Sequence, residues 1–449
     1  MLQSNNKINE YINSVCQNIR WKKSHIFISK ELENHIIDQK KAFISDGLDE
    51  DTALEKAIIE MGDPIDVGTE LDRIHKPKIE WSIIRLTGIA LLLGLVIQII
   101  VTKGTESIIA RSIIYSIFGI AVMIMAYLTD FTIIGKNPKM LFFSFLAIVL
   151  GVSIFSPRYY GQVFYTKFVL LLYPTIFTGI IYSMRNNGYL GLVFCGVSMA
   201  ISYIVLLPFA MYSTYALYSL LSLILLTISI LKGWFNISRI KGLLLVYVPV
   251  TIAVIMTLLN NTYLLRRLTN AFNPYLDTTG AGFMSNLASQ ILHNAKFIGE
   301  GLGSISGTML PDINTDFLLT YLIHRFGWIS IIGVIAVLAL LIIKSFKLCL
   351  KQSSILGSLV SLSVVITISA QIILYVGYNL SFHLIAPLTL PLISYGGVGT
   401  IINMFLIGIM LSVFKWDNLI NDDVLISSDK RFFSYTDGKI IIDLKSLNS

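Results

Sequence analysis

Charged residues are scarce in this sequence, since Asp, Glu, Lys and Arg together make up 14% of its 449 residues. Soluble globular proteins carry about 25% of these residues, so an ordinary soluble protein is excluded. Hydrophobic residues make up 55% of the chain. Several apolar runs exceed the roughly 20 residues that a helix needs to cross a bilayer. We therefore expect an all-α, polytopic membrane protein.

Cysteine is also rare. Cys16, Cys195 and Cys349 lie far apart, and no Cys-x-x-Cys pair occurs. This spacing predicts neither a disulfide framework nor a zinc site. The first 80 residues are polar throughout, which is not the pattern of a secretory signal peptide.

The two signs of charge are distributed unevenly. Residues 1–80 contain 11 basic and 15 acidic residues, for a net charge of −4, whereas the remaining chain contains 23 basic and 12 acidic residues, for a net charge of +11. An acidic head on a basic membrane region does not suggest nucleic-acid binding. We interpret the Lys and Arg residues of the membrane region as topology signals and as groups that bind anions.

The segment 1–80 has the pattern of a small soluble helical domain. We expect three helices, over 29–46, 51–61 and about 67–74, with stops at Gly47 and at Gly62-Asp63-Pro64. Acidic residues begin the second helix, where the helix dipole favours them. We predict a cytoplasmic adaptor domain with a regulatory or docking role and no chemistry of its own.

Hydropathy predicts a membrane domain of ten transmembrane helices over residues 81–416. The expected spans are 82–101, 110–129, 139–155, 165–184, 189–209, 213–231, 241–260, 317–343, 354–376 and 388–414. With both termini in the cytoplasm, nearly every inner loop is basic, in agreement with the positive-inside rule. We expect a cytoplasmic C-terminal tail over 417–449, with a hairpin around Asp437-Gly438.

One connection is long enough to suggest function. Residues 261–316 lie on the predicted outer face, and this loop or its junction with the next span holds four of the six carboxylates between residues 81 and 416. Ionisable groups at a membrane boundary are costly unless they are hydrated or paired, so they are functional candidates. The foremost is Asp316, at the mouth of the eighth span. Two roles remain open for it, a helix cap and a catalytic group.

Three sequence blocks carry a resemblance to a known family. They are RLTNAFNPYLDTTGAGF (267–283, directly after Arg266), AKFIGEGLGSISGTMLPDINTDF (295–317) and LPLISYGGVGTIINMFLIGIML (390–411). The first resembles the start of a large outer loop, the second a glycine turn that leads to Thr-Asp-Phe, and the third the signature of a last span. In these features the chain resembles the SEDS family (shape, elongation, division and sporulation), which contains FtsW, RodA and SpoVE.

The resemblance implies a function and a set of site residues. Members of the family are peptidoglycan glycosyltransferases that join lipid II units and release undecaprenyl pyrophosphate, working with a class B penicillin-binding transpeptidase in the bacterial cytoplasmic membrane. Asp316 matches their essential carboxylate. It would accept a proton from the attacking sugar hydroxyl, or it would hold a divalent cation, Mg²⁺ or Mn²⁺, against the pyrophosphate. From their charge and side of the membrane we expect Arg158, Lys167, Arg266, Arg267 and Lys296 to bind the substrate phosphates, with Arg158 best supported by the resemblance, and we add Thr315 and Ser394 as substrate-binding residues.

The chain also departs from the family pattern. Asn314 occupies the position of a His before Thr-Asp-Phe, His324 and Arg325 replace a pair of acids, and Pro387 replaces a Gly. The sequence thus indicates a divergent member. Two alternatives to a polymerase remain open: a flippase or transporter for a lipid-linked precursor, and a catalytically silent scaffold of a cell-wall synthesis complex.

Overall fold

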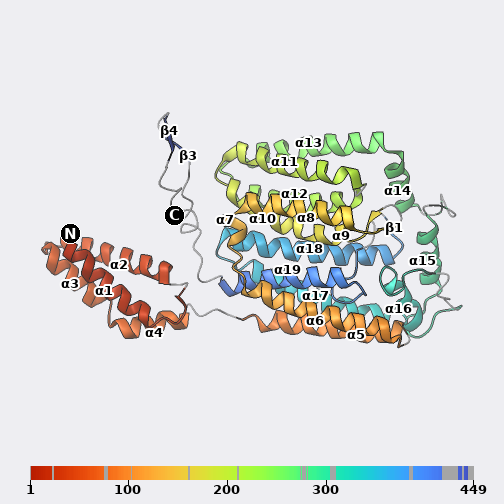
Figure 1. Cartoon of the computed structure of the whole chain (residues 1–449), viewed down its shortest axis with the longest axis horizontal. Coiled ribbons are helices and arrows are strands. Elements are labelled where there is room, and N and C mark those ends of the chain that lie inside the picture. Colours follow the sequence, from red (N-terminus) through yellow and green to blue (C-terminus); the bar gives the residue numbers. More distant parts are fainter. Residues whose placement is uncertain are drawn as a thin grey trace. The chain divides into compact units, whose positions relative to one another are not determined.

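The computed structural model describes residues 2–22, 25–74, 79–102, 104–159, 162–209, 212–273, 275, 280, 282–303, 310–383, 388–416, 433–436 and 439–442. The chain divides into two compact units (Figure 1). One comprises Met1–Ile79 with Lys415–Ser449, and the other comprises Glu80–Phe414.

Four helices form the N-terminal part of the first unit: α1 (Leu2–Gln17), α2 (His25–Ser45), α3 (Glu50–Glu60) and α4 (Pro64–Ile74). The Asp49 side chain caps α3 by accepting a hydrogen bond from the Thr52 amide at 3.1 Å. Pro64 begins α4, a position where its missing N–H removes no helix hydrogen bond. The three predicted helices are confirmed within a few residues, but α1 was not predicted.

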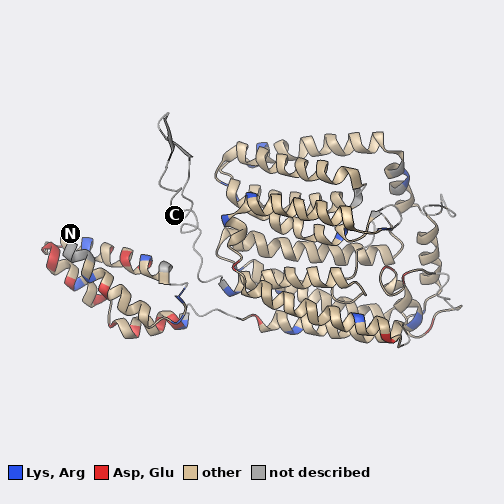
Figure 2. Cartoon of the chain, in the orientation of Figure 1, with Lys and Arg blue, Asp and Glu red and all other residues tan. Residues whose placement is uncertain are grey.

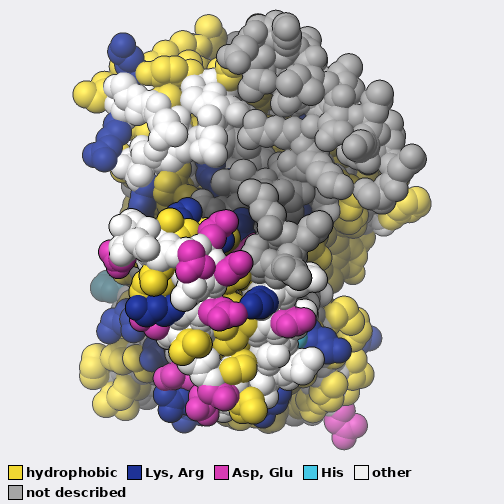
Figure 3. Space-filling view, turned by 90° about the vertical axis from the view of Figure 1, so that its left-hand side faces the viewer, with side chains coloured by type: hydrophobic (Ala, Val, Ile, Leu, Met, Phe, Trp, Pro, Cys, Tyr) yellow, Lys and Arg dark blue, Asp and Glu magenta, His cyan; other side chains and the backbone are white. Residues whose placement is uncertain are grey.

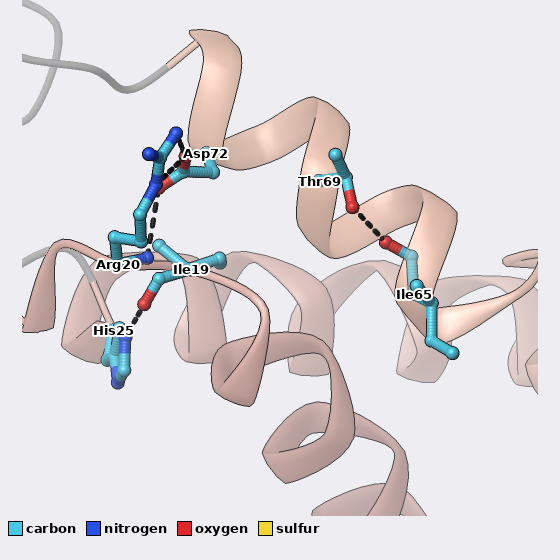
Figure 4. A network of polar contacts seen from close by, with 6 residues as sticks. All are labelled: Ile19, Arg20, His25, Ile65, Thr69 and Asp72. Carbon is cyan, nitrogen blue, oxygen red and sulfur yellow. Dashed lines mark hydrogen bonds and ion pairs between the residues drawn. The ribbon is translucent and has the colours of Figure 1, made fainter.

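The helices pack around a shared apolar core. Ile12 and Val15 of α1, Ile36 of α2 and Leu54 of α3 are all buried in it. At the edge of this core the Arg20 guanidinium and backbone amide both donate to the Asp72 carboxylate, at 2.8–3.0 Å (Figure 4). This pair ties the end of α1 to α4. On the surface of these N-terminal helices, acidic side chains are mixed with basic and apolar ones (Figure 3).

Two short strands lie near the C-terminus. β3 (Phe433–Thr436) and β4 (Lys439–Ile442) pair antiparallel, with Thr436 opposite Lys439. This pairing confirms the predicted C-terminal hairpin, although Asp437 and Gly438 themselves lie outside the described residues.

Ten of the described helices are long and apolar enough to cross a membrane, which confirms the predicted count and the all-α class. They are α5 (Trp81–Val101), α6 (Glu106–Leu128), α8 (Pro138–Phe155), α9 (Thr166–Val169) continued by α10 (Tyr173–Met184), α11 (Gly188–Leu206), α12 (Tyr212–Leu231), α13 (Arg239–Asn260), α17 (Ile329–Cys349), α18 (Ile355–Asn379) and α19 (Gly397–Trp416). They run side by side, with most charged residues near their ends (Figures 1 and 2).

Two predicted spans are wrong in extent. The span predicted over 317–343 is divided into α16 (Leu318–Phe326) and α17, because Gly327 has a φ of +90° and leaves the helix. A Cβ at Gly327 would lie 2.5 Å from the Phe297 carbonyl oxygen, so the backbone of another segment occupies the space beside this turn. The span predicted over 388–414 starts at Gly397, since residues 388–396 are not helical.

The long connection over 261–316 contains two helices that the sequence did not predict, α14 (Thr262–Phe272) and α15 (Phe283–His293). Both lie across one end of the bundle of spans, together with α16 and the short hairpin of β1 (Arg158–Tyr159) and β2 (Gln162–Val163) (Figure 1). We call this end the loop end. Asp277 lies outside the described residues.

Candidate active site

A tight turn at the loop end presents Asp316. The carbonyl oxygen of Asp312 accepts hydrogen bonds from the amides of Thr315 at 3.0 Å, Asp316 at 2.9 Å and Phe317 at 3.2 Å. Asp312 itself has a φ of +52°, in the left-handed region that Asp adopts more readily than most residues. The turn therefore follows from the Asp at its first position, and it fixes the backbone of Asp316.

The start of α16 is capped by a residue from another helix. Asn379 of α18 accepts a hydrogen bond from the Thr320 amide through Oδ1 at 3.0 Å, and its Nδ2 donates to the Asp316 carbonyl at 2.9 Å. The residue before the helix, Phe317, makes no side-chain cap bond. Asn379 thus caps α16, which is one of the two roles that the sequence left open for Asp316. The Asp316 carboxylate is therefore not needed as a helix cap.

The Asp316 carboxyl group is half-buried and differs from an ordinary surface acid. Burial raises its pKa to about 6, because removal from water disfavours the charged form. The positive charge of Lys167 opposes this effect and the negative charge of Asp312 adds to it. Asp316 can consequently hold or release a proton near neutral pH, which is the property required of a general base.

Lys167 is placed beside Asp316 by the segment that enters the fourth span. Its Nζ lies 4.9 Å from the centre of the Phe164 ring and 5.1 Å from that of Phe168, so two aromatic rings support the cation. Its carbonyl accepts a hydrogen bond from the Tyr218 hydroxyl at 2.8 Å, which fixes α9 against α12. The structure therefore brings together three of the predicted site residues, Thr315, Asp316 and Lys167.

An aromatic layer adjoins the same turn. The rings of Tyr378 and His383 stack with centroids 3.9 Å apart, and the Phe317 ring lies 5.2 Å from Tyr378.

Segment 299–303 runs along the end of α16, where the Gly301 amide donates to the His324 carbonyl at 2.7 Å and Arg325 forms an ion pair with Glu300. The residues that replace the expected acids, His324 and Arg325, thus serve to join this segment to α16.

The other predicted site residues are more dispersed. Arg158 in β1, Arg266 on α14 and Lys296 are exposed at the loop end, and the side chain of Arg267 lies outside the described part of the chain. Ser394 is buried, and its hydroxyl donates to the Leu390 carbonyl at 3.4 Å. As placed, Ser394 supports its own segment, whereas the three basic residues are available to an anionic ligand.

The residues around Asp316 do not form a closed cation site. Within the described residues there is no group of three or more His, Cys, Asp or Glu side chains that could hold a metal ion. Asp312 and Asp316 are close enough to influence one another, but a cation there would need oxygen ligands from a substrate or from water. Mg²⁺ is commonly bound in that way, through one or two carboxylates and a substrate phosphate.

Sequence reasoning missed the uncharged polar residues of the site. Gln98, Tyr375 and Asn379 lie within predicted or observed spans, are buried, and bond to the backbone of residues 314–316. A polar residue inside an apolar span is a recognisable signal, because it must find a partner in the membrane. Which of several such residues reaches the site depends on the packing of the helices and could not be predicted.

Ten apolar spans with a carboxylate and a lysine at one end of the bundle define a polytopic membrane protein with a candidate site at its loop end. The model of the FTSW_RODA_SPOVE family of cell cycle proteins matches residues 79–418. The chain belongs to this family, as its sequence blocks predicted.

Curated relatives match over part of their length. A probable peptidoglycan glycosyltransferase FtsW from Xanthomonas oryzae pv. oryzae is 28% identical over 186 residues, which is 40% of this chain and 38% of the relative. The corresponding protein from Geobacter metallireducens is 29% identical over 176 residues, or 39% of this chain and 46% of the relative. The aligned region thus spans less than half of these relatives.

Solved structures show the same fold. A chain of a peptidoglycan synthase complex superimposes with a TM-score of 0.60 at 15% identity and covers 76% of this chain and 98% of its own. The rod shape determining protein RodA of Thermus thermophilus gives a TM-score of 0.50 at 14% identity, with 76% and 97% coverage. The arrangement of the spans is therefore that of RodA.

Proposed function

We propose that this protein is a peptidoglycan glycosyltransferase that polymerises lipid II into glycan strands at the outer face of the bacterial cytoplasmic membrane. The observation that carries the proposal is the Asp316–Lys167 pair. A carboxyl group with a pKa near 6 lies at the loop end of a SEDS-type bundle. It is not needed as a helix cap, because Asn379 caps α16. Such a group suits a proton transfer at neutral pH.

In the reaction, Asp316 acts as the base. Its carboxylate takes the proton from the acceptor sugar hydroxyl while that oxygen forms a bond to the anomeric carbon of the donor. The bond between the anomeric carbon and the pyrophosphate oxygen breaks, and undecaprenyl pyrophosphate leaves with the electron pair. The Lys167 ammonium stabilises the negative charge that grows on the leaving group. No step requires a cation that the chain would have to hold by itself.

The charges of the loop end suit an anionic, lipid-linked substrate. Arg158, Arg266 and Lys296 are exposed there, and guanidinium groups match phosphate oxygens with paired hydrogen bonds. We assign these residues, with Lys167, to the pyrophosphate groups of donor and product. Arg267 and Thr315 are proposed as further substrate contacts. Ser394 is proposed to contribute by holding segment 388–396 in place.

The orientation that we propose in the membrane rests on basic residues at the end of the bundle opposite the loop end. Basic residues lie at or beside the helix ends there, including Lys136, Arg185, Lys232 and Lys347, and the positive-inside rule favours a cytoplasmic location for that end and for both termini. The loop end then faces outward, where a class B penicillin-binding transpeptidase would receive the glycan strands. We propose such an enzyme as the partner.

The test is to incubate the purified full-length protein with lipid II, with and without a class B transpeptidase and with and without divalent cation. The proposal predicts glycan strands that a muramidase digests. Movement of lipid II across liposomes without strand formation would contradict it and support a transporter. Absence of both from folded protein would support a scaffold.

A further inference from the structure

Three consecutive carbonyl oxygens at the candidate base are each held by a donor from elsewhere in the fold. The Asn314 carbonyl accepts from the Gln98 amide nitrogen at 3.2 Å and from the Tyr395 backbone amide at 3.0 Å. The Thr315 carbonyl accepts from the Tyr375 hydroxyl, and the Asp316 carbonyl accepts from Asn379 at 2.9 Å. The peptide that carries Asp316 is thus fixed residue by residue from outside its own turn.

The donors come from α5, α18 and the non-helical segment 388–396, which are far apart in sequence. Gln98 is 2% exposed, and Tyr375 and Asn379 are fully buried. Buried amides and hydroxyls inside apolar helices are costly unless they are bonded. Three of them, from two different helices, converge on three successive peptide groups.

Two of the donors, Asn379 and Gln98, have further hydrogen-bond partners. The side-chain Nδ2 of Asn379 also donates to the Tyr375 carbonyl at 3.0 Å, and its Oδ1 accepts from the Thr320 backbone amide. These bonds fix the orientation of the side chain. Gln98 also reaches the Ile393 carbonyl at 3.5 Å, next to the point where α5 and segment 388–396 meet. There a Cβ on Gly94 would lie 2.6 Å from the Leu392 carbonyl oxygen, so the two backbones are in direct contact.

We infer that Gln98, Tyr375 and Asn379 form a backbone clamp that positions Asp316 for proton transfer. The inference rests on the proposed function and adds to it three positioning residues, none of which touches the substrate. The clamp uses the carbonyl groups of residues 314–316 and leaves the Asp316 carboxylate to the reaction. A base held in this way needs no reorganisation before each transfer, and a displacement of about 1 Å can lower a rate by about 100-fold.

The alternative is that these polar residues only fasten helices together, as polar side chains in membranes commonly do. The same helix supplies a matched control. Gln371 of α18 is also fully buried, but it exchanges hydrogen bonds at 3.0 and 3.2 Å with Asn403 of α19, and none of these bonds goes to residues 312–317. Loss of Gln371 removes helix-fastening bonds without loosening the clamp.

The first arm of the test compares lipid II polymerisation by full-length Tyr375→Phe, Asn379→Leu, Gln98→Leu and Gln371→Leu. The clamp predicts that kcat falls about 10- to 100-fold in the first three variants while KM stays within about threefold of wild type. Gln371→Leu keeps its kcat within about threefold at a comparable loss of thermal stability. Equal kcat for clamp and control variants of equal stability would overturn the inference.

The second arm does not depend on activity. Hydrogen exchange followed by mass spectrometry reports the amides of Thr315, Asp316 and Phe317, which the Asp312 carbonyl protects. Tyr375→Phe and Asn379→Leu should exchange these amides at least about tenfold faster than wild type, and Gln371→Leu should not. Unchanged exchange would refute the clamp. An inactive wild-type protein with the expected exchange pattern would instead refute the proposed function and retain the clamp.

Discussion

At the scale of single residues, the chemistry depends on how differently the few acidic residues of the membrane unit are placed. Glu106 and Asp312 are exposed, and Glu300 is paired with Arg325. Asp316 combines partial burial with a neighbouring lysine, and its pKa of about 6 reflects the balance between the two. The same carboxylate would be an ordinary surface acid without this burial.

The raised pKa predicts the pH dependence of the reaction. The base is the ionised form of Asp316, which dominates above its pKa of about 6. We expect kcat/KM for polymerisation to rise with pH through about 6, with a rate at pH 5 near one-tenth of the plateau. Initial rates of polymerisation from pH 4.5 to 8 measure it. A flat profile across this range would argue against Asp316 as the base.

Lys167→Met should move that profile in a defined direction. The Lys167 charge lowers the pKa of Asp316, so its loss raises this pKa and shifts the acid limb of kcat/KM to higher pH. The pH profile of the variant against that of wild type measures the shift. Lys296→Met is the control, since Lys296 does not contribute to the Asp316 pKa, and its acid limb should stay in place. A limb at unchanged or lower pH in Lys167→Met would contradict the placement of Lys167.

The sequence could identify Asp316 and Lys167 because charges are rare in apolar surroundings and stand out. It could not identify Tyr375 or Asn379 as their supports. Both lie in an apolar span that contains other polar residues, such as Gln371, and nothing local distinguishes the residue that reaches the turn from the one that pairs with α19. Helix packing makes that distinction.

At the scale of elements, the site depends on α5 lying directly against segment 388–396. Gly94 permits this approach, because a side chain there would meet the Leu392 carbonyl oxygen and the Ile393 backbone. Leu392 itself has a φ of +67°, an unusual conformation for a bulky residue. The contact places Gln98, one turn further along α5, within reach of Asn314.

Gly94→Ala should therefore damage both stability and rate. The added methyl group would lie 2.6 Å from a carbonyl oxygen, and overpacking of this kind costs about 1–3 kcal/mol. Thermal unfolding in detergent and initial polymerisation rates measure the two effects. Gly88→Ala in the same helix is the matched control, because no atom lies within 4 Å of a Cβ there. Equal behaviour of the two variants would show that the contact is unimportant.

The elements also show where hydropathy succeeds and fails. Eight of the ten predicted spans agree with observed helices within a few residues, since long apolar runs have few alternatives in a bilayer. The predictions over 317–343 and 388–414 were wrong at their loop-end sides, where Gly327 ends α16 and residues 388–396 are not helical. In both places the backbone conformation depends on contacts with other segments. Hydropathy along the sequence cannot predict such contacts.

At the scale of the whole molecule, the chain comprises two units of opposite character. Residues 1–80 carry a net charge of −4, and the rest of the chain carries +11. The N-terminal helices have their own apolar core, which includes Ile36 and Leu54. We propose that residues 1–79 form an independent cytoplasmic adaptor, in keeping with the domain boundaries expected from the sequence.

Isolated residues 1–79 should accordingly fold by themselves. We expect a helical circular dichroism spectrum and a cooperative thermal transition. Ile36→Ala, at a fully buried position, should lower the unfolding free energy by about 2–4 kcal/mol. Ile59→Ala, at a position 76% exposed, should have little effect. A fragment without a cooperative transition would show that this unit depends on the remainder of the chain.

The most direct test of the central claim is the initial rate of lipid II polymerisation by Asp316→Asn beside Glu106→Gln and wild type. Asparagine keeps the size of the side chain and cannot accept the proton, so the rate should fall by about 10²- to 10⁴-fold. Glu106 is an exposed carboxylate at the start of α6, and its loss should leave the rate unchanged. Polymerisation by Asp316→Asn at the rate of the Glu106 variant would contradict the assignment of Asp316 as the base.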